Sequence, residues 1–116
     1  MVQIATANTN RDGTDTMGTV LTGASTGTVI NLIRVVATGT TTAGVVRLFL
    51  HDGTNTRLLQ EILVPAITPS TTVPVFSRSL MYVYPEILFL PSASWQLRAS
   101  TNNAETFNVF AFGANL

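Results

Sequence analysis

The stretch that decides the fold reads Val45-Val46-Arg47-Leu48-Phe49-Leu50-His51-Asp52-Gly53-Thr54-Asn55. Its apolar half predicts a strand. The Asp52-Gly53 pair predicts a tight turn, because Asp-Gly favours the positive φ values of short hairpin loops. The chain then returns through a second apolar run at residues 57–64. Residues 45–51 and 57–64 are therefore predicted to form an antiparallel hairpin.

Short apolar runs between clusters of Gly, Pro, Asn and Asp continue on both sides of this hairpin, a pattern typical of β-sandwiches and barrels. No window has apolar residues at helical spacing. Residues 65–74 hold three of the five prolines and predict a crossover between sheets, since proline cannot donate to a central ladder. Further strands are predicted at residues 2–7, 18–22, 29–38, 75–84, 87–90, 95–100 and 106–112.

The fold class that follows is all-β: one antiparallel, jelly-roll-like β-sandwich domain of eight or nine strands, spanning residues 1–116. A chain of 116 residues is long enough to bury one core, and it contains no cysteine. Residues 1–15 are polar and rich in turn formers. They form either an ordinary first strand or an extended N-terminal arm that adds to another subunit's sheet.

Two predicted strands are apolar on both faces. Strict alternation places Val29, Ile33 and Val35 on one face of the first, and Ile30, Leu32 and Val36 on the other. In the last strand, Phe107 and Val109 share one face, and Phe110 and Phe112 share the other. Such a strand is either central in the fold or covered by another subunit.

Arg34 and Arg47 lie inside strands that are otherwise apolar. A buried arginine is costly unless it is paired, so each either reaches solvent or meets a carboxylate. Glu61 on the partner strand of the hairpin is the candidate within the chain for Arg47; the alternative is pairing across a subunit interface. The residues proposed for such an interface are Ile4, Arg11, Arg34, Arg47, Phe110 and Phe112.

The charge content argues against several classes of partner. Six arginines balance six acidic residues, and charged residues make up 10% of the chain against a usual share of about 25%. Either neighbours cover much of the surface, or Thr and Asn keep it soluble. Without a basic patch, nucleic-acid binding is not expected. No apolar run reaches the roughly 20 residues of a membrane span. No signal peptide is evident, which predicts synthesis in the cytoplasm.

The sequence predicts no catalytic, cofactor-binding or metal site. His51 is the only histidine, and its neighbour Asp52 points to the opposite face of a strand, so the two cannot form a relay. No pair of acidic residues has a spacing that suggests carboxylate catalysis. The segment from Asp12 to Asp15 lacks the further oxygen ligands of a calcium loop.

Three segments carry a resemblance to a known group of proteins: the hairpin quoted above, Pro65-Ala66-Ile67-Thr68-Pro69-Ser70, and the run from Leu90 to Thr101, which reads LPSASWQLRAST. With them, residues 3–116 resemble small all-β virion structural proteins of tailed bacteriophages. The resemblance implies a capsid decoration or cement protein that trimerises on the outside of the head and reinforces contacts between major capsid subunits. Alternatives are a tail or neck component, or a carbohydrate- or receptor-binding module of a tail fibre that uses Trp95, Tyr82 and Tyr84.

Overall fold

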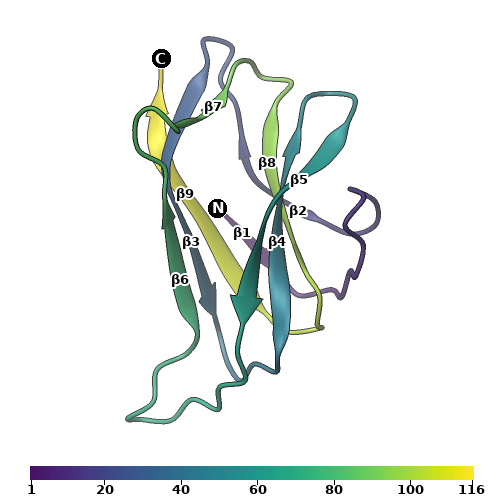
Figure 1. The fold of residues 1–116 in the computed structure, drawn as a ribbon, viewed down its shortest axis with the longest axis vertical. Helices are drawn as coiled ribbons and strands as arrows, with labels where there is room; N and C mark the ends of the chain where they lie inside the picture. Colours follow the sequence, from purple (N-terminus) through teal and green to yellow (C-terminus); the bar gives the residue numbers. More distant parts are fainter.

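The computed structural model describes residues 1–116 and confirms the all-β prediction. Nine strands form two antiparallel sheets that pack face to face as a sandwich (Figure 1). Sheet A has the order β1-β9-β3-β6, with β7 also paired to β3, and sheet B has the order β2-β8-β4-β5. Jelly-roll connectivity stays a prediction. The strands are β1 (Val2–Ile4), β2 (Gly18–Thr22), β3 (Thr28–Ala37), β4 (Gly44–His51), β5 (Thr56–Val64), β6 (Ser77–Met81), β7 (Leu88–Leu90), β8 (Gln96–Thr101) and β9 (Phe107–Asn115).

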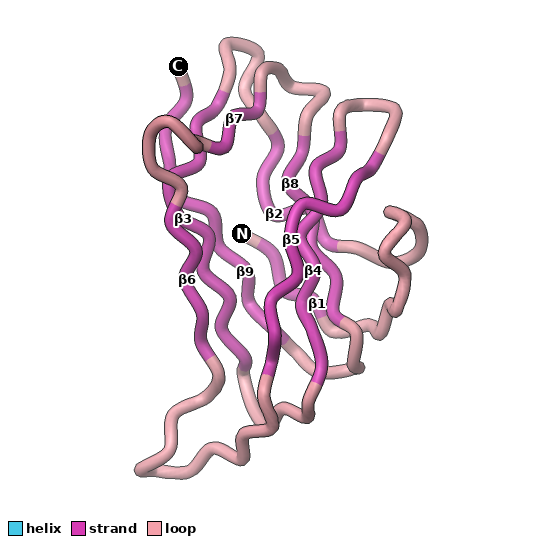
Figure 2. Tube along the Cα trace, in the orientation of Figure 1, coloured by secondary structure: helices cyan, strands magenta, loops and turns pink.

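The predicted hairpin is formed by β4 and β5. In its turn the Asp52 amide donates to the Asn55 carbonyl at 3.0 Å, and Gly53 has a φ of 102°. The Asp52 carboxylate accepts the amides of Thr54 and Asn55 at 2.9 and 2.7 Å, and these hydrogen bonds lower the pKa of its carboxyl group. The segment after β5 crosses from sheet B to β6 of sheet A without forming a strand, as its prolines predict (Figure 2).

The core lies between the sheets and contains 17 buried apolar residues. Phe76 from the crossover packs edge-to-face against Phe107 of β9, with ring centroids 6.4 Å apart. Leu97 and Ala99 of β8 face inward and are fully buried, and Trp95 is partly buried against the core. Each large side chain removed from water here stabilises the fold by about 1.5–3 kcal/mol.

The predicted faces of β3 are partly wrong, because a β-bulge shifts its alternation. Ile30 pairs with Gly113 and Leu32 with Phe112, so Asn31 is an extra residue on β3. Ile30 therefore faces the core together with Ile33, while Leu32 faces outward. Gly113 is required at this place, since a Cβ there would collide with the backbone carbonyl of Val29.

Two predicted strands are longer than the observed ones. β6 ends at Met81; the Tyr82 amide still donates to the Asn31 carbonyl, and the chain then turns at residues 83–86. β1 ends at Ile4, after which the chain crosses to sheet B, where the Asn8 amide donates to the Thr101 carbonyl at 2.8 Å. In each case the backbone leaves one sheet before the apolar pattern of the sequence ends.

Candidate interaction surface

Part of the outer face of sheet B is covered by residues 5–17, which we call the N-terminal strap (Figure 1). Asn8 holds the strap together: its side-chain amide donates to the carbonyls of Thr14 and Thr16 at 3.0 and 2.9 Å. Further along, Gly13 lies directly against Thr56 of β5. Asn8 is 2% exposed, so this part of the segment packs on its own chain and does not project as an arm.

Arg47 fastens the strap to the sheet. Its Nε donates to Glu61 Oε2 at 2.9 Å, its Nη1 to the Asn8 carbonyl at 3.2 Å, and its Nη2 reaches Asn102 Oδ1 at 3.2 Å. Arg11, which belongs to the strap, donates through Nε to the same Glu61 oxygen at 2.8 Å. The pairing of Arg47 with Glu61 within the chain is thereby confirmed.

This arrangement sets the electrostatics of Glu61. The hydrogen bond from Arg11 lowers the pKa of its carboxyl group, and that from Arg47 lowers it further, against an opposing effect of desolvation. Two guanidinium groups on one carboxylate oxygen favour the ionised form, because an opposite charge in contact stabilises it. The ionised carboxylate therefore links strap and sheet at neutral pH.

Phe49 is a buried aromatic residue on the outer side of sheet B. It follows Arg47 by two positions on β4 and shares its outward direction, and it is not a member of the core cluster between the sheets. Nevertheless it is fully buried. The chain therefore buries an aromatic side chain on the outside of sheet B without help from a partner.

The outer face of sheet A is bare by contrast. Cross-strand register aligns Leu32, Met81 and Phe112 in one row and pairs Val29 with Phe89 in the next. Phe110 and Phe112 stack with ring centroids 6.2 Å apart and planes 16° from parallel. We call the outward apolar side chains of this sheet the apolar face: Val29, Leu32, Val36, Met81, Phe89, Phe110 and Phe112.

The exposure of the apolar face is large for a single chain. Met81 is 74% exposed and Phe112 is 48% exposed. Beside them lies a rim of exposed apolar residues: Val83, Tyr84 and Ile87 in the β6–β7 connection, and Leu116. Contiguous exposed apolar surface of this kind marks an interaction site in soluble proteins.

One charge lies within the apolar face. Arg34 projects between Phe110 and Ser79 in register, and its Nε donates to Ser79 Oγ at 3.1 Å. The salt bridges of the chain both involve Glu61 on the other sheet, so Arg34 has no carboxylate partner. The polar end of the face is formed by Gln3, whose side-chain amide donates to Asn108 Oδ1 at 2.9 Å.

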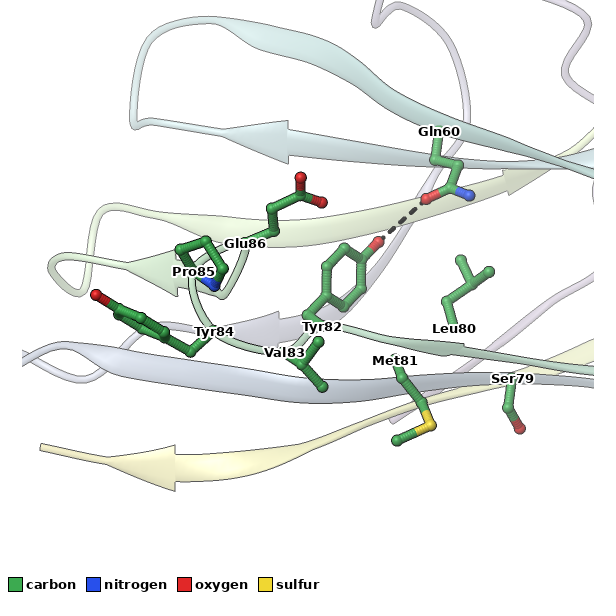
Figure 3. Close-up of a pocket in the computed structure, with 9 residues that line it drawn as sticks. All are labelled: Gln60, Ser79, Leu80, Met81, Tyr82, Val83, Tyr84, Pro85 and Glu86. Carbon is green, nitrogen blue, oxygen red and sulfur yellow. Dashed lines mark hydrogen bonds between the residues drawn. The ribbon is translucent and has the colours of Figure 1, made fainter.

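A groove of about 380 Å³ lies between the edges of the two sheets (Figure 3). Tyr82 forms its wall and donates its hydroxyl to Gln60 Oε1 of β5 at 3.2 Å, and burial raises the pKa of this hydroxyl. The Glu86 carboxylate lies on the same side of the connection, whereas Tyr84 points away from Tyr82 (Figure 3). The polar and aromatic residues that line the groove are two tyrosines, one glutamine, one serine and one glutamate.

The remaining chemical groups are dispersed. His51 Nδ1 lies 2.9 Å from the hydroxyl oxygen of Thr56 across the hairpin, at the end of β4. No group of three or more His, Cys, Asp or Glu side chains is positioned to hold a metal ion. The structure contains no helix with the length and hydrophobicity needed to span a membrane.

The structure separates the six residues proposed for an interface into three sets. Arg34, Phe110 and Phe112 lie together on the outside of sheet A. Ile4 and Arg47 are 6% and 2% exposed and lie within the chain, so neither offers a surface to another subunit in this conformation. Arg11 is exposed on the strap, on the opposite side of the molecule from the apolar face. That face also includes Met81 and Phe89, which the sequence analysis did not select.

The chain matches no protein-family model, and no curated protein or solved structure is significantly similar to it.

Proposed function

We propose that this protein is a non-enzymatic structural protein of a virion, a capsid decoration or cement protein of the kind found in tailed bacteriophages. In this role it self-associates, with a trimer favoured, sits on the capsid surface and reinforces contacts between major capsid subunits. It needs no cofactor and binds neither nucleic acid nor membrane. The observation that carries the proposal is the apolar face, because large exposed apolar patches are rare on monomeric soluble proteins and mark interaction sites.

Two further features support the proposal. The low charge content leaves little to keep free monomers apart, as expected of a protein that works in an assembly. The strand order, with β1 beside β9 in one sheet and β2 beside β8 in the other, agrees with the jelly-roll connectivity that we propose together with this function.

The test is co-sedimentation with capsids assembled from the major capsid protein encoded in the same genome, combined with light scattering to measure the solution mass. We expect saturable binding to assembled capsids, little binding to unassembled capsid subunits, and a raised resistance of decorated capsids to heat. A protein that stays in the supernatant at every capsid concentration would contradict a decoration role.

A second candidate, a carbohydrate-binding module of a tail fibre or spike, is favoured by the groove at Tyr82. Sugar sites combine an apolar ring with a few hydrogen-bonding groups, and Gln60 and Glu86 supply such groups here. A glycan array tests it: a selective signal that Tyr82→Ala abolishes and that Phe112→Ala, on the outer face of sheet A, retains would favour this candidate over capsid binding.

A further inference from the structure

We infer that the apolar face is the surface that copies of this chain bury against one another. The capsid contact then falls on another part of the molecule. This assignment rests on the proposed function, since it names the partner for the surface on which that function depends.

The first argument is area. An aromatic side chain carries roughly 150–250 Å² of coverable surface, so the exposed fractions of the face and its rim amount to on the order of 800 Å². A standard-size protein interface takes about 800 Å² from each partner. The bare surface of one copy is therefore the size that a stable contact with another copy requires.

The second argument is the character of the surface. The face carries Arg34 and no carboxylate, and the rim adds Glu86, so the surface offers little charge for recognising an oppositely charged partner. An apolar surface is best covered by other apolar surface, and further copies of the chain supply it, whether two faces meet directly or three meet around a threefold axis. The self-association of low-charge chains follows from the same physics, because nothing on the face repels its equivalent except this one guanidinium group.

The third argument is the contrast with sheet B, which the strap already covers in part. Outside the apolar face and its rim, the large exposed apolar residues are Met1, Leu58, Leu63 and Val73. These are dispersed over the N-terminus, β5 and the crossover. The molecule therefore has one large apolar surface, and self-association is assigned to it.

The test exploits the absence of cysteine from the chain. A single thiol is introduced as Met81→Cys on the apolar face, or as Leu63→Cys on β5 as the matched control, since the two positions are 74% and 69% exposed. Maleimide labelling rates are then measured over a range of protein concentrations. We expect labelling of Met81→Cys to slow as concentration rises, and labelling of Leu63→Cys to stay constant.

Charged variants provide an independent readout. Met81→Asp and Phe112→Asp place a carboxylate where the contact is apolar, and we expect each to weaken self-association by roughly 100-fold or more, while Leu63→Asp leaves it unchanged. Light scattering measures the mass, and circular dichroism confirms that each variant is folded. Because both positions face outward, folding of the single chain is expected to be unaffected.

The outcomes separate this inference from the proposed function. The inference would be overturned if the labelling rate of Met81→Cys did not depend on protein concentration, or if the charged variants kept the parental mass. If those variants keep that mass but lose capsid binding, the face contacts the capsid, so the inference fails and the decoration role stands. If they become monomeric while the parent does not bind capsids, the inference holds and the decoration role fails.

Discussion

The outer faces of the two sheets both contain phenylalanine side chains, but Phe49 on sheet B is buried and Phe112 on sheet A is exposed. β4 in sheet B and β3 in sheet A are both strands with apolar residues on both sides. The strap packs on the outside of β4 through Arg47, and Phe49 on the same side is fully buried, whereas Phe112 beside β3 stays 48% exposed. A two-sided apolar strand therefore indicates that something covers it, and only the path of the rest of the chain decides whether that cover is internal.

Alanine substitutions at Phe49 and Phe112 are the strongest test of this difference between the two sheets. We expect Phe49→Ala to lower the free energy of unfolding by about 3–5 kcal/mol, because truncating this fully buried ring leaves a cavity. Phe112→Ala, measured at a protein concentration where copies are separate, is expected to cost less than about 1 kcal/mol. Urea unfolding curves measure both. Equal losses at the two positions would show that Phe49 is not fully buried in solution.

The two arginines make the same comparison with charge. Arg47→Ala removes the donor to the Asn8 carbonyl and to Asn102, and we expect a loss of about 2–3 kcal/mol because the buried Asn8 carbonyl loses this donor and the part-buried Asn102 loses its partner. Arg34→Ala should change stability by no more than about 0.5 kcal/mol, since its side chain is exposed. A matched loss in the Arg34 variant would contradict the exposed position of that residue.

The bulge in β3 decides which side chains form the apolar face, and Gly113 makes the bulge possible. We expect Gly113→Ala to cost about 2 kcal/mol, because the added methyl group meets the Val29 carbonyl. Gly39→Ala is the matched control: a Cβ there meets no atom within 4 Å, and the change should be neutral or stabilise by up to about 1 kcal/mol. Thermal melts of both variants provide the measurement, and an unperturbed Gly113 variant would refute the close approach.

The smallest expected effect is a dependence of stability on pH. The folded-state pKa of Glu61 is lowered by Arg11 and then by Arg47, so its contribution is fully present above the unfolded-state value of about 4.3. It is lost as the pH falls from there through the lower folded-state pKa. We expect Glu61→Gln to reduce stability at pH 7 and to flatten the loss of stability in acid. The measurement is urea unfolding between pH 7 and pH 3. If Glu61→Gln loses as much stability in acid as the parent protein does, the ion pairs of Glu61 with Arg11 and Arg47 do not contribute to stability.

Much of the fold was predictable because local rules dominate there. The turn at Asp52-Gly53, the pairing of Arg47 with Glu61 and the proline-rich crossover all follow from residues close in sequence or directly opposite in a hairpin. The faces of β3 were predicted only in part, since a single inserted residue, Asn31, reverses the alternation. Nothing in the run from Val29 to Val36 marks that insertion, which depends on how Gly113 approaches from β9.

The sequence predicted an apolar interaction surface but identified only some of its residues. Phe110 and Phe112 were selected because they share a face of their strand, and alternation within one strand is a local property. Met81 and Phe89 lie on the same face because of the register of β6 and β7 against β3, and this register cannot be read from the sequence of either strand.

The sequence by itself determined that this protein is a β-sandwich with a tight central hairpin, a sheet-to-sheet crossover and more apolar strand faces than one core needs. Those properties depend on turn chemistry, proline and periodicity of two, which act over a few residues. The tertiary structure alone decided that the strap covers part of sheet B and that sheet A remains open, because both depend on which distant segments meet when the two layers close on their core.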